Sequence, residues 1–385
     1  MRYHAAMRSD CNFKDLRRTA FCPPDCPSVA GGDVFGQVRV DRVGVLPPRS
    51  DRVVDVAVLD MNHGWPNVGH DAVIAAIREV ACDLAEPLAD AGLTVRVLSF
   101  DVRGAGKVPG ADGGRYGLTI GTGGPGHLDP RLNDGKDENA QGIKEDPAWE
   151  STLFRYFDAI AEHDEAALIG LCHTFGVMCR WLDVAQPVAR GPEKGGKSEG
   201  VMDNILTDAG VAHPLFLALS RQLADGRRLA VIDSRIYDLL PRDGAHRRVC
   251  IVATETLGVG GPPGDAITMM EVARVDGTAV PRIFGANHHP EIIDRTRLLT
   301  MLRTKLERGD VERGWYDQRV SSLLTRFHDA SRDAALRTTS EFAFLGPVRF
   351  HLTRILRARA AALGLAFPVH EYDVERALTE TPTLS

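Results

Sequence analysis

Apolar runs of strand length alternate with amphipathic segments of helix length through the middle of the chain. Residues 53–60 form a β-branched run that ends in an acidic residue, and residues 93–100 form a second run of this kind. Between them, residues 73–84 place apolar side chains at the spacing of one helix face. This order predicts two parallel strands joined by a helix.

The same alternation continues to about residue 290. Short apolar runs predict further strands over residues 116–120, 166–171, 228–232, 248–253 and 283–286, and helical spacing predicts a helix over residues 153–160. We therefore expect a flavodoxin-like α/β sandwich, a three-layer fold with a mainly parallel central sheet and helices on both faces.

The two flanks of this region have a different pattern. Residues 1–51 carry many prolines and glycines without a sustained period, which predicts an irregular N-terminal extension. Residues 301–385 are helical in pattern and rich in arginine, which favours packing helices with solvated outer faces. One domain over residues 52–300 is expected between them.

Composition narrows the class of protein. The 385 residues are 44% hydrophobic and 25% charged, as in an ordinary globular protein, and the net charge of −6 argues against a nucleic-acid partner. No apolar stretch is long enough to span a bilayer, and residues 1–10 lack the apolar centre of a signal peptide. We expect a cytoplasmic protein that binds neither nucleic acid nor membrane.

Seven scattered cysteines, an odd number, favour reduced thiols over a disulfide framework. Cys22 and Cys26 have the spacing of half a zinc site, but four good ligands are not in view. A site built from Cys172, His173, His288 and His289 is a second metal hypothesis. We predict neither a metal nor a cofactor.

Cys172 follows an apolar run and precedes a helical pattern, with Gly170 and Gly176 on either side. This arrangement predicts a strand that turns sharply into a helix, where the glycines ease the reversal and the helix N-terminus favours a thiolate. A buried, purely structural cysteine is the alternative.

Glycine-rich segments occur twice near predicted strand ends. Residues 121–126 (GTGGPG) follow a strand, so their N–H groups are placed to meet a phosphate or an oxyanion. Residues 191–198 (GPEKGGKS) match the phosphate-loop pattern, but the segment before them is a poor strand, which argues against nucleotide binding.

The last predicted strand ends at His288, His289, Pro290 and Glu291. Proline fixes the local backbone, so the imidazole of His289 and the carboxylate of Glu291 can project to the same side. A base with an orienting carboxylate is what a cysteine nucleophile requires.

Together these motifs resemble the class I, or triad, glutamine amidotransferases, most closely the amidotransferase subunits of the anthranilate-synthase type. The resemblance is carried, in chain order, by residues 123–126 (GGPG), 170–172 (GLC), 190–198 and 284–291, and it covers about residues 52–294. It implies that Cys172 is the nucleophile, His289 the acid and base, and Glu291 the orienting carboxylate. The N–H groups of Gly124 and His173 would bind the oxyanion.

The chain departs from the family where the substrate is held. After the cysteine, residues 173–176 (HTFG) stand where the family has Leu-Gly-His-Gln. Residues 232–235 (IDSR) stand in place of Tyr-His-Ser-Leu, and Asn287 and His288 stand in place of Gln-Phe before the catalytic histidine. Glutamine as the substrate is therefore one hypothesis among others. The candidate pocket residues are Gly123, Pro125, Phe175, Asp233, Ser234, Arg235 and His288.

Three functions follow from this pattern. The first is a glutamine amidotransferase that supplies ammonia to a separate synthase. The second is a hydrolase or acyltransferase that uses the same triad on another amide, ester or thioester. The third, a catalytically silent binding or regulatory subunit, is disfavoured because all three triad residue types are present.

Overall fold

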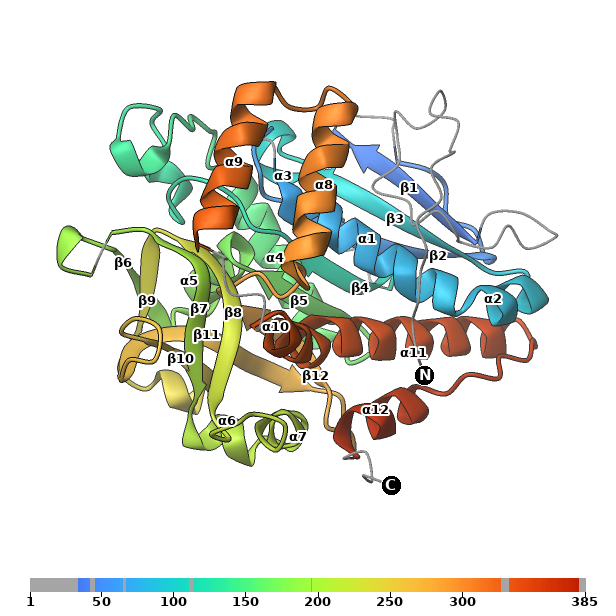
Figure 1. Ribbon diagram of the computed structural model, residues 1–385. Helices are drawn as coiled ribbons and strands as arrows, with labels where there is room; N and C mark the ends of the chain where they lie inside the picture. The colour runs from blue at the N-terminus through green and yellow to red at the C-terminus, as the bar shows by residue number, and fades with distance from the viewer. Residues whose placement is uncertain are drawn as a thin grey trace.

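The computed structural model describes residues 34–41, 46–64, 67–110, 114–194, 196–326 and 332–380. Within these residues, ten strands form one sheet (Figure 1). In spatial order they are β1 (Phe35–Val40), β3 (Thr94–Asp101), β2 (Val53–Asp60), β4 (Tyr116–Gly121), β5 (Ala167–Leu171), β12 (Pro281–Ala286), β11 (Pro263–Arg274), β10 (Cys250–Thr256), β7 (Ser198–Leu206) and β8 (Arg228–Arg235).

The sheet has a parallel part and an antiparallel part. The strands from β1 to β12 pair in parallel, and those from β12 through β11, β10 and β7 to β8 pair antiparallel. A separate two-stranded sheet joins β6 (Ala185–Ala189) to β9 (Tyr237–Pro241). The predicted α/β class with a mainly parallel sheet is confirmed, whereas the antiparallel extension was not predicted.

Helices cover both faces of the parallel part. On one face lie α1 (Val68–Asp83), α2 (Ala85–Ala91) and α11 (Gly346–Ala362), and on the other lie α4 (Ala148–Glu162) and α5 (His173–Leu182). Strand β2 is apolar almost throughout because both of its faces are buried. Val56 and Val58 face the first helix layer, and Leu59 faces the second.

Shorter elements complete the described part of the chain. They are α3 (Val102–Ala105), α6 (Asp208–Ala212), α7 (Pro214–Ser220) and the 3₁₀ turns η2 (Pro130–Leu132), η3 (Glu138–Ala140), η4 (Pro192–Lys194) and η5 (Ala245–Arg247). Towards the C-terminus follow α8 (Arg295–Glu307), α9 (Arg313–Arg326), α10 (Asp333–Ser340), the π-helical segment η7 (Glu341–Leu345), α11 and α12 (Glu371–Thr379).

One sequence prediction about the flanks needs correction. Residues 35–40 are not irregular, because they form the edge strand β1 beside β3. The C-terminal region is helical, as its pattern predicts, and α11 packs on the sheet: a Cβ on Gly117 of β4 would be 2.7 Å from Ile355 Cγ1. The C-terminal helices are thus part of the sandwich itself.

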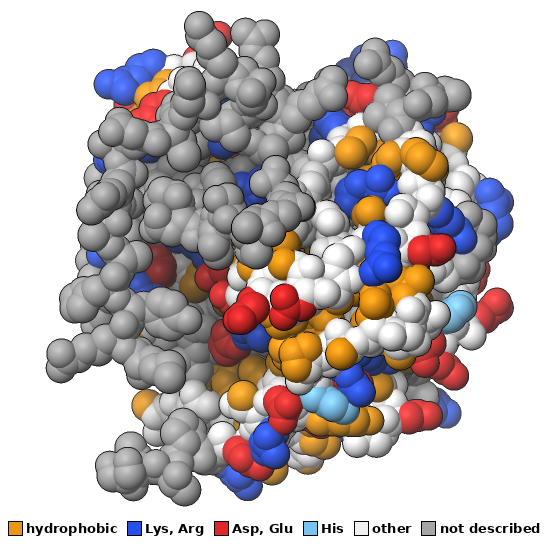
Figure 2. All heavy atoms as spheres, turned by 90° about the vertical axis from the view of Figure 1, so that its right-hand side faces the viewer, with side chains coloured by type: hydrophobic (Ala, Val, Ile, Leu, Met, Phe, Trp, Pro, Cys, Tyr) orange, Lys and Arg blue, Asp and Glu red, His pale blue; other side chains and the backbone are white. Residues whose placement is uncertain are grey.

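One face of the molecule carries charged and apolar side chains side by side in its described part. Figure 2 shows basic, acidic and apolar side chains interspersed over the described part of the face that lies on the right in Figure 1. None of the described helices combines the length and the apolar character needed to cross a membrane. The expected cytoplasmic location stays a prediction.

Candidate active site

Cys172 lies at the sharp turn between β5 and α5. Its backbone has φ +47° and ψ −102°, outside the usual range for a residue with a side chain. The turn is held by two hydrogen bonds: the Cys172 N–H donates to the Ala286 carbonyl at 2.7 Å, and the Gly176 N–H donates to the Cys172 carbonyl at 3.1 Å. The predicted strand–turn–helix is present, with the cysteine as the strained residue.

Gly170, one of the two glycines that flank the cysteine, has a different task from the one that we expected, and Gly285 of β12 shares this task. A Cβ on Gly170 would lie 2.2 Å from Met178 Sδ, and a Cβ on Gly285 would lie 2.5 Å from Phe175 Cδ2. These glycines let α5 approach β5 and β12 closely, while Cys172 itself makes the reversal.

His289 and Glu291 meet Cys172 from the end of β12. His289 Nδ1 is 2.7 Å from Glu291 Oε1, and the ring also hydrogen-bonds the Cys172 side chain. Because Nδ1 is bound to the carboxylate, Nε2 is the nitrogen that faces the thiol. The His289 N–H donates to the Ile232 carbonyl at 2.8 Å, which anchors the segment to β8.

The surroundings of His289 favour its protonated form. Burial lowers the pKa of the imidazole, but the negative charge of Glu291 and the charge and hydrogen bond of the Cys172 sulfur outweigh it, so the pKa is raised well above the ordinary 6.5. Glu291 is fully buried beside the N-terminus of α1, where a Cβ on Gly69 would be 2.8 Å from its Oε1. The helix dipole stabilises a carboxylate there.

The glycine turn after β4 lies against the cysteine. A Cβ on Gly123 would be 2.9 Å from His289 Cε1 and 3.6 Å from Cys172 Sγ, and one on Gly124 would be 2.2 Å from the Met61 carbonyl oxygen. The imidazole of His173 hydrogen-bonds the Gly124 backbone, and burial lowers its pKa well below the ordinary value. Both predicted oxyanion residues therefore lie together at the turn.

Arg103 fixes this turn, and its role was missed from the sequence. Its guanidinium donates to the carbonyls of Met61 at 2.9 Å and Pro125 at 2.6 Å. It also forms a two-point pair with Glu145, at 2.9 and 2.8 Å, in which both side chains are completely buried. Arg103 belongs to the short helix α3, and the glycine-rich sequence around it gave no sign of a buried ion pair.

A pocket of ≈ 230 Å³ opens beside Cys172. Of the predicted site residues, it is lined by Cys172, His289, Gly124, His173, Pro125, Asp233, Ser234 and Arg235. Gly123 touches the cysteine and histidine from behind. Glu291 lies behind His289.

Two predicted pocket residues lie elsewhere. Phe175 is fully buried in the core between α5 and β12, where it packs against Gly285. His288 points away from the pocket and lies 3.3 Å from Asn204 Nδ2, and burial lowers its pKa to about 3. Phe175 and His288 stand next to the predicted catalytic residues in the sequence, but the sequence does not show whether their side chains point into the pocket or away from it.

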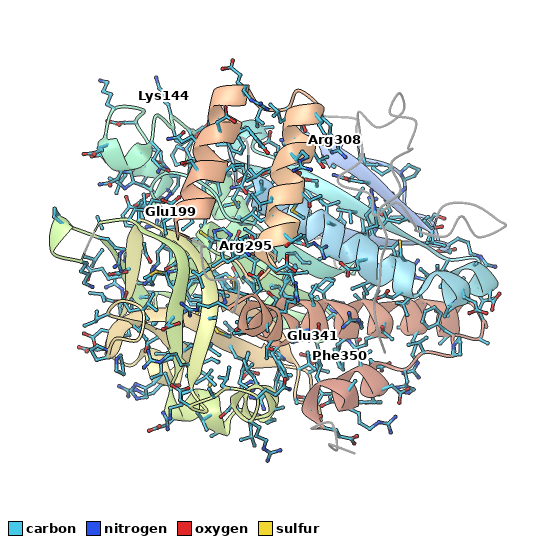
Figure 3. All side chains as sticks on the ribbon, viewed as in Figure 1. Lys144, Glu199, Arg295, Arg308, Glu341 and Phe350 are labelled. Atoms are coloured by element: carbon cyan, nitrogen blue, oxygen red, sulfur yellow. The ribbon has the colours of Figure 1, made fainter. Side chains whose placement is uncertain are left out.

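The structure adds pocket residues that were not predicted. Leu298 and Leu302 of α8 and Trp315 and Arg319 of α9 form one wall, and Lys197 and Glu199 of the β7 segment form its edge. Glu199 lies beside the lower end of α9, while Arg295 and Arg308 mark the two ends of α8 (Figure 3). The arginine-rich C-terminal pattern had suggested only solvated packing helices.

The described residues of the 191–198 segment do not form a phosphate loop. Strand β7 rather than a helix begins at Ser198, and the segment is held by ion pairs. Arg190 and Lys194 bind Asp238 at 2.6 and 2.7 Å, and Ser198 Oγ donates to Asp233 at 2.7 Å. The segment supports the pocket wall.

Among the residues described, no group of three or more His, Cys, Asp or Glu side chains is placed to hold a metal ion. The candidate pair Cys22 and Cys26 lies outside those residues. Cys172, Cys179 and Cys250 are free thiols, whereas Cys82 is disulfide-bonded, contrary to the expectation of reduced thiols throughout.

No family model and no curated protein matches the sequence. Solved structures with detectable similarity include a glutamine amidotransferase from Methylobacillus flagellatus (12% identity, 83% of this chain and 98% of that chain, TM-score 0.39). Another is a proposed GMP synthase subunit from Thermoplasma acidophilum (11% identity, 61% of this chain and 84% of that chain, TM-score 0.36). Both TM-scores are low, so the fold and the site are defined by the strand order and the contacts given above and not by these similarities.

Proposed function

We propose that this chain is a glutamine amidotransferase-like enzyme in which Cys172 attacks a carboxamide. The observation that carries this proposal is the alignment of the strained cysteine with His289 and Glu291 at one end of the pocket. The closer likeness to anthranilate-synthase subunits stays a prediction from the motifs alone.

The reaction begins with attack of the Cys172 sulfur on the amide carbon. The carbonyl oxygen becomes an oxyanion that the N–H groups of Gly124 and His173 stabilise. His289 Nε2–H gives its proton to the amide nitrogen, the C–N bond breaks, and ammonia departs, so that the acyl group stays on the sulfur as a thioester. Water then attacks the thioester, His289 takes a proton from it, and the C–S bond breaks to release the acid and the thiolate.

Glutamine is the substrate that this proposal favours, with glutamate and ammonia as products. A separate synthase that accepts ammonia is the partner it implies. Glu291 orients the ring and stabilises the imidazolium, which the raised pKa of His289 supports.

The test is ammonia and glutamate release from glutamine by the purified chain, beside Cys172→Ala. We expect turnover that disappears in the alanine variant. Cys250→Ala is the matched control, because Cys250 is also a free, half-buried thiol but lies outside the pocket, and it should keep full activity. Turnover that survives in Cys172→Ala would refute the assignment of the nucleophile.

A second function uses the same triad on a larger acyl substrate. The observation that favours it is the apolar wall of Leu298, Leu302 and Trp315, which a short polar substrate does not need. A panel of amides, esters and thioesters with increasing acyl length tests this alternative. Hydrolysis that rises with chain length, without ammonia release from glutamine, would favour it over the first proposal.

A further inference from the structure

A buried threonine, Thr122, lies between the end of β4 and the glycine turn. The Thr122 N–H donates to the Leu59 carbonyl at 3.0 Å, which ties this residue to β2. The next two residues, Gly123 and Gly124, form the turn beside Cys172. Thr122 is thus the last residue that the sheet fixes before the turn begins.

The hydroxyl of Thr122 makes two hydrogen bonds. The Met61 N–H donates to Thr122 Oγ1 at 3.1 Å, and the hydroxyl donates to the Gly123 carbonyl at 3.0 Å. A hydroxyl has one proton to donate, so this proton is committed to the Gly123 carbonyl. Arg103 binds two other carbonyls of this region, those of Met61 and Pro125. The threonine therefore holds a part of the turn that the arginine does not reach.

The carbonyl of Gly123 and the N–H of Gly124 belong to one peptide group. Because a trans peptide group is planar, its carbonyl and its N–H point in opposite directions. A hydrogen bond that fixes the Gly123 carbonyl therefore also fixes the direction of the Gly124 N–H, one of the two oxyanion donors in the proposed reaction. Glycines permit many backbone conformations, so an outside contact is needed to keep this peptide group in one orientation.

Thr174, the second residue of α5, holds Thr122 in turn. Its hydroxyl and its backbone N–H both donate to the Thr122 carbonyl, at 2.8 and 3.3 Å. Thr174 is completely buried and packs closely on the end of β4, where a Cβ on Gly121 would be 2.3 Å from its Cγ2. The two threonines thus connect β4, the glycine turn and the helix that follows Cys172.

We propose that Thr122 is a positioning residue for the oxyanion site. Its hydroxyl directs the Gly124 N–H through the shared peptide group, and Thr174 keeps that hydroxyl in place. This inference rests on the proposed function, because the oxyanion arises only when Cys172 attacks a carbonyl carbon. Neither threonine lines the pocket, so both act through the backbone and not through contact with the substrate.

The test compares two reagents that modify Cys172 by different routes. The thiolate attacks p-nitrophenyl acetate at its carbonyl carbon, so an oxyanion forms before p-nitrophenolate leaves and the sulfur is acetylated. It attacks iodoacetamide at the methylene carbon and displaces iodide directly, so no oxyanion forms. Mass spectrometry measures the rate of each modification at Cys172.

Three variants are compared with the wild type. Thr122→Val replaces the hydroxyl by a methyl group of similar size, and Thr122→Ser keeps the hydroxyl. Thr119→Val is the matched control, because Thr119 is a buried threonine of β4 whose hydroxyl is hydrogen-bonded to Tyr156, at 2.6 Å. It reports the effect of losing a buried hydrogen bond that does not reach the glycine turn.

We expect Thr122→Val to slow acetylation about tenfold and to leave alkylation unchanged, because the oxyanion donor is misdirected and not deleted. Thr122→Ser and Thr119→Val should keep both rates. Equal slowing of both reactions in Thr122→Val, or slowing of neither, would overturn the inference. Equal slowing of acetylation in Thr119→Val would also overturn it, since the effect would then reflect general destabilisation of β4.

Ammonia release from glutamine, measured on the same samples, separates this inference from the proposed function. If the wild type is acetylated but releases no ammonia, the proposed function fails, whereas a selective loss of acetylation in Thr122→Val still supports the inference. If the wild type releases ammonia and Thr122→Val is acetylated at the full rate, the inference fails and the proposed function stands. Thr174→Val should reproduce part of the selective loss.

Discussion

At the scale of single residues, the cysteine carries the strain of the site. A residue with a side chain in such a backbone conformation costs about 1–3 kcal/mol, which the surrounding hydrogen bonds and packing must offset. The flanking glycines predicted the turn, but the sequence could not show that Cys172 itself adopts the strained backbone conformation. A glycine can be present because the backbone needs a positive φ or because a neighbouring side chain packs closely against it, and the sequence does not distinguish these two reasons.

A methyl group at Gly123 should disable the site without unfolding the chain. In Gly123→Ala the new Cβ would lie 2.9 Å from His289 Cε1, so the imidazole must shift from its position beside Cys172. We expect kcat/KM to fall about 100-fold, since misplacement of a catalytic group by about 1 Å has this effect. Gly36→Ala, with nothing within 4 Å of its Cβ, should keep full activity. Equal activity of the two variants would contradict the described contact.

The pH dependence of activity should follow His289. The proposed reaction uses the protonated imidazole, so we expect activity to persist above pH 6.5 and to fall as the pH rises through the raised pKa. In Glu291→Gln the carboxylate charge is lost, so burial dominates and lowers the pKa of His289. The fall of activity at high pH, the alkaline limb of the profile, should then move to lower pH. Profiles of kcat/KM against pH measure the shift. Glu271→Gln, which removes the carboxylate of a second buried pair with His213, should leave the limb in place.

The same pKa shift has a consequence for stability. Because protonation of His289 is favoured in the folded state, its contribution to the free energy of unfolding is complete below the ordinary pKa of 6.5 and is lost as the pH rises through the raised value. The stability difference between wild type and Glu291→Gln should therefore shrink at alkaline pH. Denaturant unfolding at several pH values checks this, and a difference that grows with pH would contradict it.

At the scale of elements, strands around the site were predicted more reliably than the sheet that contains them. The strand predicted over residues 53–60 is β2, and the run before Cys172 is β5. Apolar runs identify buried strands, but they do not show which strands pair when long segments connect them. The antiparallel order β11-β10-β7-β8 was therefore not predictable from the sequence pattern. Edge strand β1 was missed for a related reason: it is short and only half-buried.

Arg103 links two elements, and its removal should affect both chemistry and stability. Arg103→Met takes the donor away from the Pro125 and Met61 carbonyls and leaves Glu145 buried without its partner. We expect kcat to fall about 100-fold through a displaced oxyanion donor, and stability to fall by about 3–5 kcal/mol. Kinetics and denaturant unfolding measure the two effects.

The matched control for Arg103 is an exposed arginine with a similar partner. Arg313 pairs with Asp317 at 3.5 Å, and both side chains are largely exposed. Arg313→Met should change stability by less than about 1 kcal/mol and leave kcat unchanged. If Arg103→Met lowered stability but kept kcat, the arginine would support the fold without positioning the glycine turn.

At the scale of the whole molecule, the C-terminal hairpin of α8 and α9 completes the pocket. It is fastened to α1 by Lys305 with Asp71 at 2.8 Å and by Arg297 with Glu79 at 2.7 Å, and Arg319 lies 3.7 Å from Glu199 of β7. An amphipathic pattern predicted the helices of this region, but helical periodicity carries no information about which distant surface a helix will meet.

Shortening Trp315 should change substrate binding more than chemistry. Trp315→Ala removes an aromatic side chain from the pocket wall but leaves Cys172 and His289 unchanged. We therefore expect KM to rise about tenfold while kcat changes little. Trp181→Ala removes an indole that packs on Phe157 outside the pocket and should leave KM unchanged. Steady-state kinetics with a common substrate compare them. An equal rise of KM in both variants would indicate general destabilisation.

The insertion of β12 between β5 and β11 also sets the order in which the site can be assembled during synthesis. Cys172 leaves the ribosome more than one hundred residues before His289, a delay on the order of ten seconds at ordinary translation rates. During that interval Cys172 has neither the imidazole of His289 beside its side chain nor the strand that accepts its backbone N–H group. A nascent chain therefore lacks the assembled Cys172, His289 and Glu291 site until residue 291 has emerged, and the C-terminal helices can close the pocket only after that.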